Sequence, residues 1–248
     1  MRTGLILGSD PFKHGALALD KYVVADAPAV PDTVAAPGGN TYPYGMLAND
    51  TFGDCVPAAL FHCDEGFFLR RGITPYPYQA PEVLTAYFAM NGVQPGPAGS
   101  SSDQGTDPSV AMAFWRDKGL PGHKLAGFGQ LPASSPNIRR AIWEFGGVIL
   151  AIALPDNWQS FVNSEGVANF TGSVTPDQNE GHGIVANGFT PDLFNIVTWG
   201  AEGTLDNAFA ASVLEQVFVP LAVDALNSAD VGPGGFNFAQ MKADLPAS

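Results

Sequence analysis

The apolar positions between residues 55 and 145 recur with a helical period in several segments. Over residues 55–71 they repeat at three- and four-residue spacing, and Gly72 provides a stop. Asp107 and Pro108 form a start signal for a further helix, because aspartate caps the first turn and proline fits its first position. The pattern therefore predicts helices over 55–71, 82–91, 107–118 and 135–145.

The pattern changes after residue 147. A continuous apolar run over 148–154 is typical of a buried strand, and three further strands are expected over 183–189, 194–199 and 215–223. A polar loop over 156–180 separates the first two, and a short helix is expected around 238–245. Helices first and strands second predict an α+β fold, in which a helical lobe packs on an antiparallel sheet lobe.

The ends of the chain differ from this central region. Residues 1–44 contain prolines that forbid regular structure, and they predict an extended N-terminal arm with one short strand within 17–24. We expect the arm to wrap the domain; joining a partner in a protein assembly and lying in a cleft are the alternatives. Residues 45–227 then form the main domain, and 228–248 form a C-terminal linker and short helix.

The net charge of this 248-residue chain excludes some classes of binding partner. Hydrophobic residues make up 46% and charged residues only 14%, with a net charge of −13. An acidic surface repels nucleic acid and anionic membranes, so neither is an expected partner. No apolar run reaches a membrane-spanning length or forms a signal sequence, so we expect synthesis as a soluble protein. The sequence leaves its final location open, with the cytoplasm and a virion as the favoured alternatives.

Two cysteines occur, Cys55 and Cys63, and both lie in the first predicted helix. Eight residues span about 12 Å along a helix, too far for a disulfide, so both thiols should be free. Cys55 lies where a loop becomes the helix, and free N–H groups and the positive helix dipole there favour a thiolate. The amide of Asn49, six residues earlier, is a further hydrogen-bond donor. This arrangement suits acyl transfer; a buried thiol beside a helix cap is the alternative.

Only His182 among the four histidines fits as a base for Cys55. It lies between two glycines at the start of a predicted strand, where it faces the helical lobe if the two lobes pack together. His62 lies about 10 Å further along the Cys55 helix, so we expect it to bond a backbone carbonyl in the core. His14 and His123 are expected to be solvated or locally bonded. The cysteines and histidines lack the short paired spacings of zinc sites, so no metal or cofactor is expected.

Three motifs occur in order: residues 44–50 leading through Gly53-Asp54-Cys55, then Gly181-His182-Gly183, then Val197-Thr198-Trp199-Gly200. Together they resemble the papain-like cysteine peptidase superfamily. More closely they are similar to uncharacterised phage and bacterial proteins grouped with bacteriocin-processing-type peptidases. The resemblance covers roughly residues 42–220 and implies an α+β, papain-like fold.

The resemblance also implies roles for individual residues. Cys55 would be the nucleophile and His182 the general base and acid, while Asn49 and the Cys55 N–H would form the oxyanion hole. The asparagine that orients the imidazole in the family corresponds here to Val197, so Thr198 and Asn195 are the candidates for that role.

These residues predict a cysteine hydrolase that cleaves a peptide or amide bond through a Cys55 thioester. A weak or inactive papain-like domain that serves as a structural or binding module, for instance in a phage particle, is the alternative. A cell-wall peptide or another acyl group is a third possibility for the substrate. The substrate pocket would come from loops 93–106 and 156–180, which carry no specificity signal.

Overall fold

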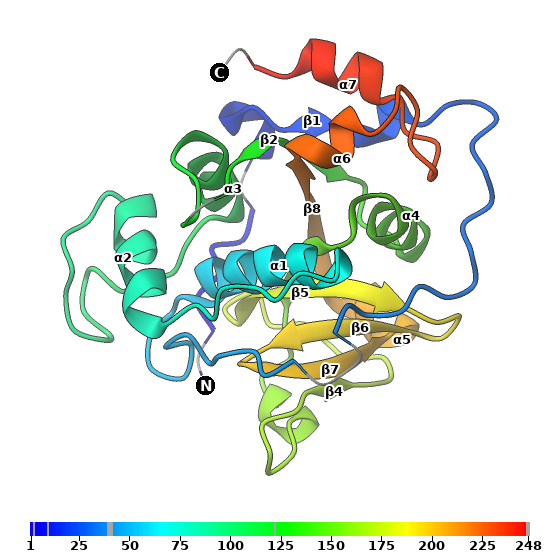
Figure 1. The fold of residues 1–248 in the computed structure, drawn as a ribbon. Helices are drawn as coiled ribbons and strands as arrows, with labels where there is room; N and C mark the ends of the chain where they lie inside the picture. The colour runs from blue at the N-terminus through cyan, green and yellow to red at the C-terminus, as the bar shows by residue number, and fades with distance from the viewer. Residues whose placement is uncertain (2, 9, 39–41, 122, 247–248) are drawn as a thin grey trace.

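The computed structural model describes residues 1, 3–8, 10–38, 42–121 and 123–246, and Figure 1 shows its fold. Parts of the predicted arm and the last two residues of the predicted C-terminal segment lie outside this description. The helices are α1 Cys55–Arg70, α2 Ala80–Met90, α3 Pro108–Asp117, α4 Ser135–Phe145, α5 Asn207–Val213, α6 Val223–Asn227 and α7 Phe238–Asp244. The strands are β1 Leu17–Ala18, β2 Leu125–Leu131, β3 Val148–Ala153, β4 Asn169–Phe170, β5 Gly181–Phe189, β6 Leu193–Thr198, β7 Ala201–Asp206 and β8 Leu214–Ala222.

The first four helices begin and end close to their predicted bounds. The Asp107 carboxylate accepts a hydrogen bond from the Ser109 N–H and so caps α3, as its start signal predicts. Gly72 and Gly146 adopt left-handed backbone conformations just after α1 and α4, where residues with a Cβ would be strained. Local sequence signals are therefore sufficient to set these helices.

One eight-stranded sheet runs through the molecule, in the order β1-β2-β8-β3-β5-β6-β7-β4. The six inner strands, β2, β8, β3, β5, β6 and β7, pair antiparallel, as predicted. The two short edge strands, β1 and β4, pair parallel to their neighbours. The result is the predicted α+β fold. In Figure 1, α1 lies along β5 near the centre of the molecule.

A hydrophobic core lies on each side of the sheet, because successive side chains of a strand point to opposite faces. On one face, Ile149 and Val185 pack with α1, α2 and α3. On the other, Leu150 and Ile184 pack with α4, α5 and α7. The strand β3 is buried on both faces, which explains its continuous apolar sequence.

Several elements differ from the prediction. β2 lies between α3 and α4, so the helices do not all precede the strands. The strand expected over 17–24 is wrong beyond Ala18, because the next four residues form a 3-10 helix. β4, β7, α5 and α6 were not predicted from the sequence.

The described parts of the arm lie against the folded domain. Val34 pairs with Phe189 at the end of β5, and β1 extends the sheet beside β2. Among the described residues, no helix combines the length and the apolar character needed to cross a lipid bilayer.

Candidate active site

Cys55 is the first residue of α1 and is almost fully buried, with 1% of its surface exposed. The backbone N–H of Gly183, on β5, donates a hydrogen bond to its Sγ atom at 3.4 Å. A Cβ atom at Gly183 would lie within 3.0 to 3.4 Å of Val56, so glycine permits this close approach of β5 to α1. The fold thus places the sulfur beside the strand that carries His182, 127 residues further along the chain.

His182 is fully buried on β5, and its two ring nitrogens have different surroundings. Its Nε2 atom hydrogen-bonds to Thr198 Oγ1 at 2.7 Å. Its Nδ1 atom has no hydrogen-bond partner among the described residues. The ring stacks on Trp199 at a centroid distance of 4.3 Å, and Trp199 stacks in turn on Trp158. The imidazole is therefore held by one nitrogen and one face, which leaves the other nitrogen unbonded.

Thr198 is the residue whose side chain hydrogen-bonds to the His182 ring. The turn between β6 and β7 consists of Trp199 and Gly200, both with positive φ, so Thr198 is the last residue of β6. Asn195, the other candidate, lies opposite Gly188, several residues from His182 along β5. Val197 faces the core that contains α1. Of these candidates only Thr198 contacts His182.

Asn49 is buried in the loop before α1, and its side chain turns toward the residue before the cysteine. Leu47 and Ala48 precede it with φ of 56° and 76°, a left-handed conformation that costs a non-glycine residue about 1 to 3 kcal/mol. The Asn49 Nδ2 atom donates to the Asp54 Oδ1 atom at 3.2 Å and, at the longer distance of 3.5 Å, to the Phe52 carbonyl. The role of Asp54 as a partner was not predicted; the only signal was an aspartate next to the cysteine.

Residues 3–6 of the arm cover this site. From the sequence we expected the arm to wrap around the domain, and lying in a cleft was one of the alternatives. The Gly4 and Leu5 N–H groups donate to the Gly181 carbonyl at 3.1 and 3.0 Å, and the Thr106 N–H donates to the Gly4 carbonyl at 2.8 Å. A remaining hollow of about 300 Å³ is lined by Thr3, Gly4, Leu5, Gly53, Gly99, Asp103, Gln104, Gly105, Asn179 and Gly181. The segment therefore lies in a cleft between the two lobes.

Glycines form the walls of this cleft where the segment passes. A Cβ atom on Gly4 would lie 2.0 Å from the Gly53 carbonyl oxygen. On the wall residues, a Cβ at Gly105 would lie 2.2 Å from the Gly4 oxygen, and one at Gly181 would lie 2.4 Å from the Leu5 oxygen. Only backbone without side chains fits at these contacts.

The covered site holds a neutral thiol and a neutral imidazole. Burial raises the pKa of the Cys55 thiol to about 12, although the N–H groups of Gly183, Gly4 and Val56 act in the opposite direction. Burial also lowers the pKa of His182 to about 3. The prediction of a Cys55 thiolate is therefore wrong for this closed state. The loss of hydration on burial disfavours the charged sulfur more than the nearby N–H groups stabilise it.

The other cysteine and histidines lie elsewhere. His62 Nε2 hydrogen-bonds to the Gly45 carbonyl at 2.8 Å, as predicted for a core histidine. The expectation that His123 is solvated or locally bonded is wrong, because it packs against α1 and bonds to the buried Asp64, 59 positions away. Cys63 is buried and free. Among the described residues, no group of three or more metal-ligating side chains could hold an ion.

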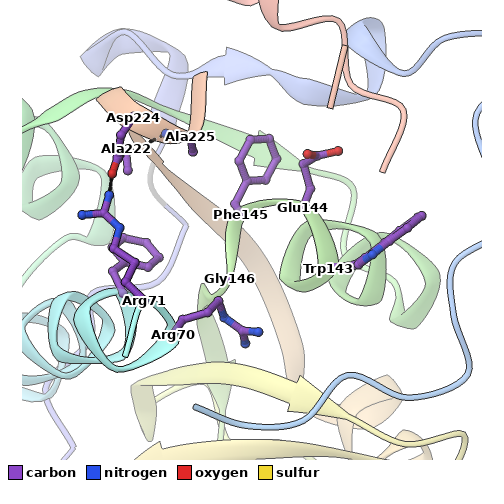
Figure 2. Close-up of a pocket in the computed structure, with 10 residues that line it drawn as sticks. Arg70, Arg71, Trp143, Glu144, Phe145, Gly146, Ala222, Asp224 and Ala225 are labelled. Atoms are coloured by element: carbon purple, nitrogen blue, oxygen red, sulfur yellow. Dashed lines mark hydrogen bonds and ion pairs between the residues drawn. The ribbon is translucent and has the colours of Figure 1, made fainter. Parts of the chain in front are cut away.

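A second hollow lies at the opposite end of α1 (Figure 2). It measures about 290 Å³ and is lined by charged residues, including Arg70, Arg71 and Glu144. Arg71 forms an ion pair with Asp224 across it, as the dashed line in Figure 2 shows. Its lining residues include neither cysteine nor histidine, so it offers no nucleophile with a base.

No protein-family model and no curated protein sequence matches the chain. Solved structures do match. Xylellain, a cysteine protease from Xylella fastidiosa, has a TM-score of 0.64 and 12% identity over 89% of this chain and 96% of its own. Procathepsin B from Trypanosoma congolense has a TM-score of 0.61 and 9% identity over 89% and 86%. A cysteine protease from Carica candamarcensis has a TM-score of 0.53 and 16% identity over 78% and 99%. The chain therefore has the papain-like fold of these cysteine proteases.

Proposed function

We propose that this protein is a cysteine hydrolase that cleaves an amide bond in a peptide or protein. Cys55 Sγ attacks the carbonyl carbon while His182 takes the thiol proton. His182 then gives that proton to the leaving amine, and a thioester with Cys55 remains. Water, deprotonated by His182, attacks the thioester; the C–S bond breaks, and the sulfur regains a proton.

The observation that carries the proposal is the asymmetric bonding of His182. Its Nε2 is bonded to Thr198, its Nδ1 has no partner among the described residues, and the next residue donates its N–H to the Cys55 sulfur. A base needs one nitrogen fixed and the other available. A purely structural buried histidine normally has both nitrogens satisfied.

The other site residues support the same chemistry. Asn49 and the Cys55 backbone N–H at the start of α1 are the proposed oxyanion donors. Thr198 orients the ring through a hydroxyl, which stabilises an imidazolium less than a carboxylate or an amide does. Moderate turnover is the expected consequence.

The closed cleft sets a condition for activity. A substrate must displace residues 3–6, because their backbone takes the Gly181 and Thr106 hydrogen bonds and buries the sulfur. Entry of substrate and water then lowers the pKa of the Cys55 thiol and raises that of His182, since burial causes both shifts. The ion pair used in acyl transfer forms only in the open state.

Hydrolysis of a peptide library by the full chain, followed by mass spectrometry, tests the proposal. Cys55→Ala should abolish cleavage, whereas Cys63→Ala, at the other buried thiol, should keep it within about twofold. Equal cleavage by both variants would refute the proposal. Absence of cleavage by the parent chain, with equally slow alkylation of Cys55 and Cys63, would indicate a binding or structural module instead.

A further inference from the structure

Asp54 occupies the cap position of α1 but does not cap the helix. An aspartate there normally accepts a hydrogen bond from the second or third N–H of the helix. The third residue of α1 is Pro57, which has no N–H, and the N–H of the second residue, Val56, acts on the Cys55 sulfur. The Asp54 side chain makes no capping bond. It is therefore free to serve another purpose beside the nucleophile.

The Asp54 carboxyl instead contacts the proposed oxyanion donor. It is fully buried, and its Oδ1 atom accepts the Asn49 amide at 3.2 Å. Its Oδ2 atom has no hydrogen-bond partner among the described residues. A buried polar atom without a partner is costly, so it calls for an explanation. The contact fixes the Asn49 amide to the residue directly before Cys55.

The surroundings of Asp54 oppose a negative charge. Asp50 in the same loop and Asp103 from the loop after α2 both act on it as like charges. Tyr87 of α2 faces the same region and donates to Asp103 at 2.9 Å. Burial, the largest cause, raises the pKa of Asp54 to about 8, although the N–H groups of the Asn49 amide and of the Asp54 backbone act in the opposite direction, so the carboxyl is mostly neutral at pH 7. In its charged form Asp54 raises the pKa of the Cys55 thiol.

We propose that Asp54 is a positioning residue, which in its neutral form holds the Asn49 amide beside Cys55 and whose ionisation makes the thiol less reactive. A neutral carboxyl keeps an oxygen that accepts the Asn49 N–H. It also leaves the nucleophile without a negative neighbour, so the thiolate forms more readily. The first half of this inference rests on the proposed hydrolase function; the second half concerns the thiol alone.

The thiol is tested by labelling the full chain with iodoacetamide at about pH 6.5 and about pH 9.5, with mass spectrometry of the Cys55 peptide. The parent chain is compared with Asp54→Asn, which keeps an acceptor oxygen but cannot ionise. Asp54→Asn should label like the parent at the lower pH and at least about threefold faster at the higher pH. Equal rates at the higher pH would overturn the electrostatic half of the inference.

Asp50→Asn is the matched control, because it removes the same charge from the same loop at an exposed position. Water and salt screen an exposed charge, so its labelling rates should stay within about twofold of the parent. If Asp50→Asn accelerates labelling as much as Asp54→Asn does, a general charge effect explains the result and the inference fails.

The positioning half is tested by peptide hydrolysis at about pH 6.5. Asp54→Ala should lower kcat about tenfold or more with little change in KM, since oxyanion donors act in the transition state. Asp54→Asn should restore kcat to within about threefold of the parent. A parent-like kcat in Asp54→Ala, or a kcat in well-folded Asp54→Asn as low as that of Asp54→Ala, would overturn it. If no chain hydrolyses peptide, the proposed function fails, and the labelling rates still decide whether Asp54 controls the thiol.

Discussion

Among the described residues, His123 and His182 each hydrogen-bond to another side chain, and the two histidines differ in what surrounds them. His123 bonds through Nδ1 to the buried Asp64, and the other oxygen of Asp64 accepts the Tyr78 hydroxyl at 2.6 Å. The Thr198 hydroxyl is the one hydrogen-bond partner of the His182 ring among the described residues. By charge alone, the His123 pair is the better match to a catalytic carboxylate–imidazole pair.

The position of the Cys55 thiol makes His182, and not His123, the better candidate for a catalytic base. His123 is surrounded by the aromatic rings of Phe67, Phe68 and Trp115, and the buried carboxylate beside it has both oxygens bonded. His182 keeps one nitrogen unbonded next to the strand residue that contacts the Cys55 sulfur. A complete network stabilises a fold, whereas an incomplete one beside a thiol leaves a group available for chemistry.

Removing each ring should separate the two roles most clearly. His182→Ala should lower kcat for peptide hydrolysis by about a thousandfold, because no other described histidine lies beside Cys55. His123→Ala should keep kcat within about threefold but destabilise the fold by about 3 kcal/mol, since Asp64 loses its partner. Steady-state kinetics and denaturant unfolding measure both effects. A large loss of kcat in well-folded His123→Ala would reverse the comparison.

Opening the cleft should change the reactivity of Cys55, which lies beside His182, and should leave the surroundings of His123 unchanged. Gly4→Glu places a side chain where even a Cβ would lie 2.0 Å from the Gly53 oxygen, so residues 3–6 must leave the cleft. Iodoacetamide should then label Cys55 at least about tenfold faster at neutral pH, because exposure to water lowers its pKa. Phe12→Glu is the control, since Phe12 is 52% exposed in the same arm. Unchanged labelling in Gly4→Glu would show that the segment does not limit access.

The weak partner of His182 should contribute a smaller effect. Thr198→Val keeps the shape of the side chain but removes the hydroxyl that bonds Nε2, so kcat should fall about tenfold with KM little changed. Thr198→Ser, which keeps a hydroxyl, should retain most of the activity. If valine and serine behave alike, the hydroxyl does not orient the ring.

The remaining effect is on stability, not on catalysis, and concerns the network around Asp64. Its neighbour Glu65 accepts the Tyr42 hydroxyl at 3.0 Å, and burial raises its pKa to about 7. Because the folded state holds this proton more tightly than the unfolded state, Glu65 lowers stability as pH rises from about 4.5 to about 7. Glu65→Gln removes the penalty, which is at most about 3 kcal/mol.

Thermal unfolding measures this effect as the difference in Tm between Glu65→Gln and the parent. The difference should grow by several degrees between acid and neutral pH and then level off. Glu165→Gln, at an exposed loop position, is the control and should show no such trend. A difference that is independent of pH would mean that Glu65 is already ionised in the folded protein.

Local sequence signals were sufficient for the first four helices and α7 and for the start of each site element. The Cys55 helix, the Asp107 cap and the strand after Gly181 follow from neighbouring residues, because caps, glycine stops and periodicity act over a few positions. β2 was missed because Gly127 and Gly129 weaken its strand pattern. Glycine is required at both positions by tertiary packing. A Cβ atom at Gly127 would lie 2.2 Å from the Leu245 side chain, and one at Gly129 would lie 2.3 Å from the Leu19 side chain.

The sequence by itself determined which residue types were at hand: a thiol at a helix start, an imidazole at a strand start, and a nearby hydroxyl. Only the tertiary structure decided that Thr198, and not Asn195, meets the ring and that Gly4 covers the sulfur. The physical reason is distance along the chain. The Gly183 contact to Cys55 joins residues 128 positions apart, so it depends on the packing of α1 against the sheet and not on any local preference.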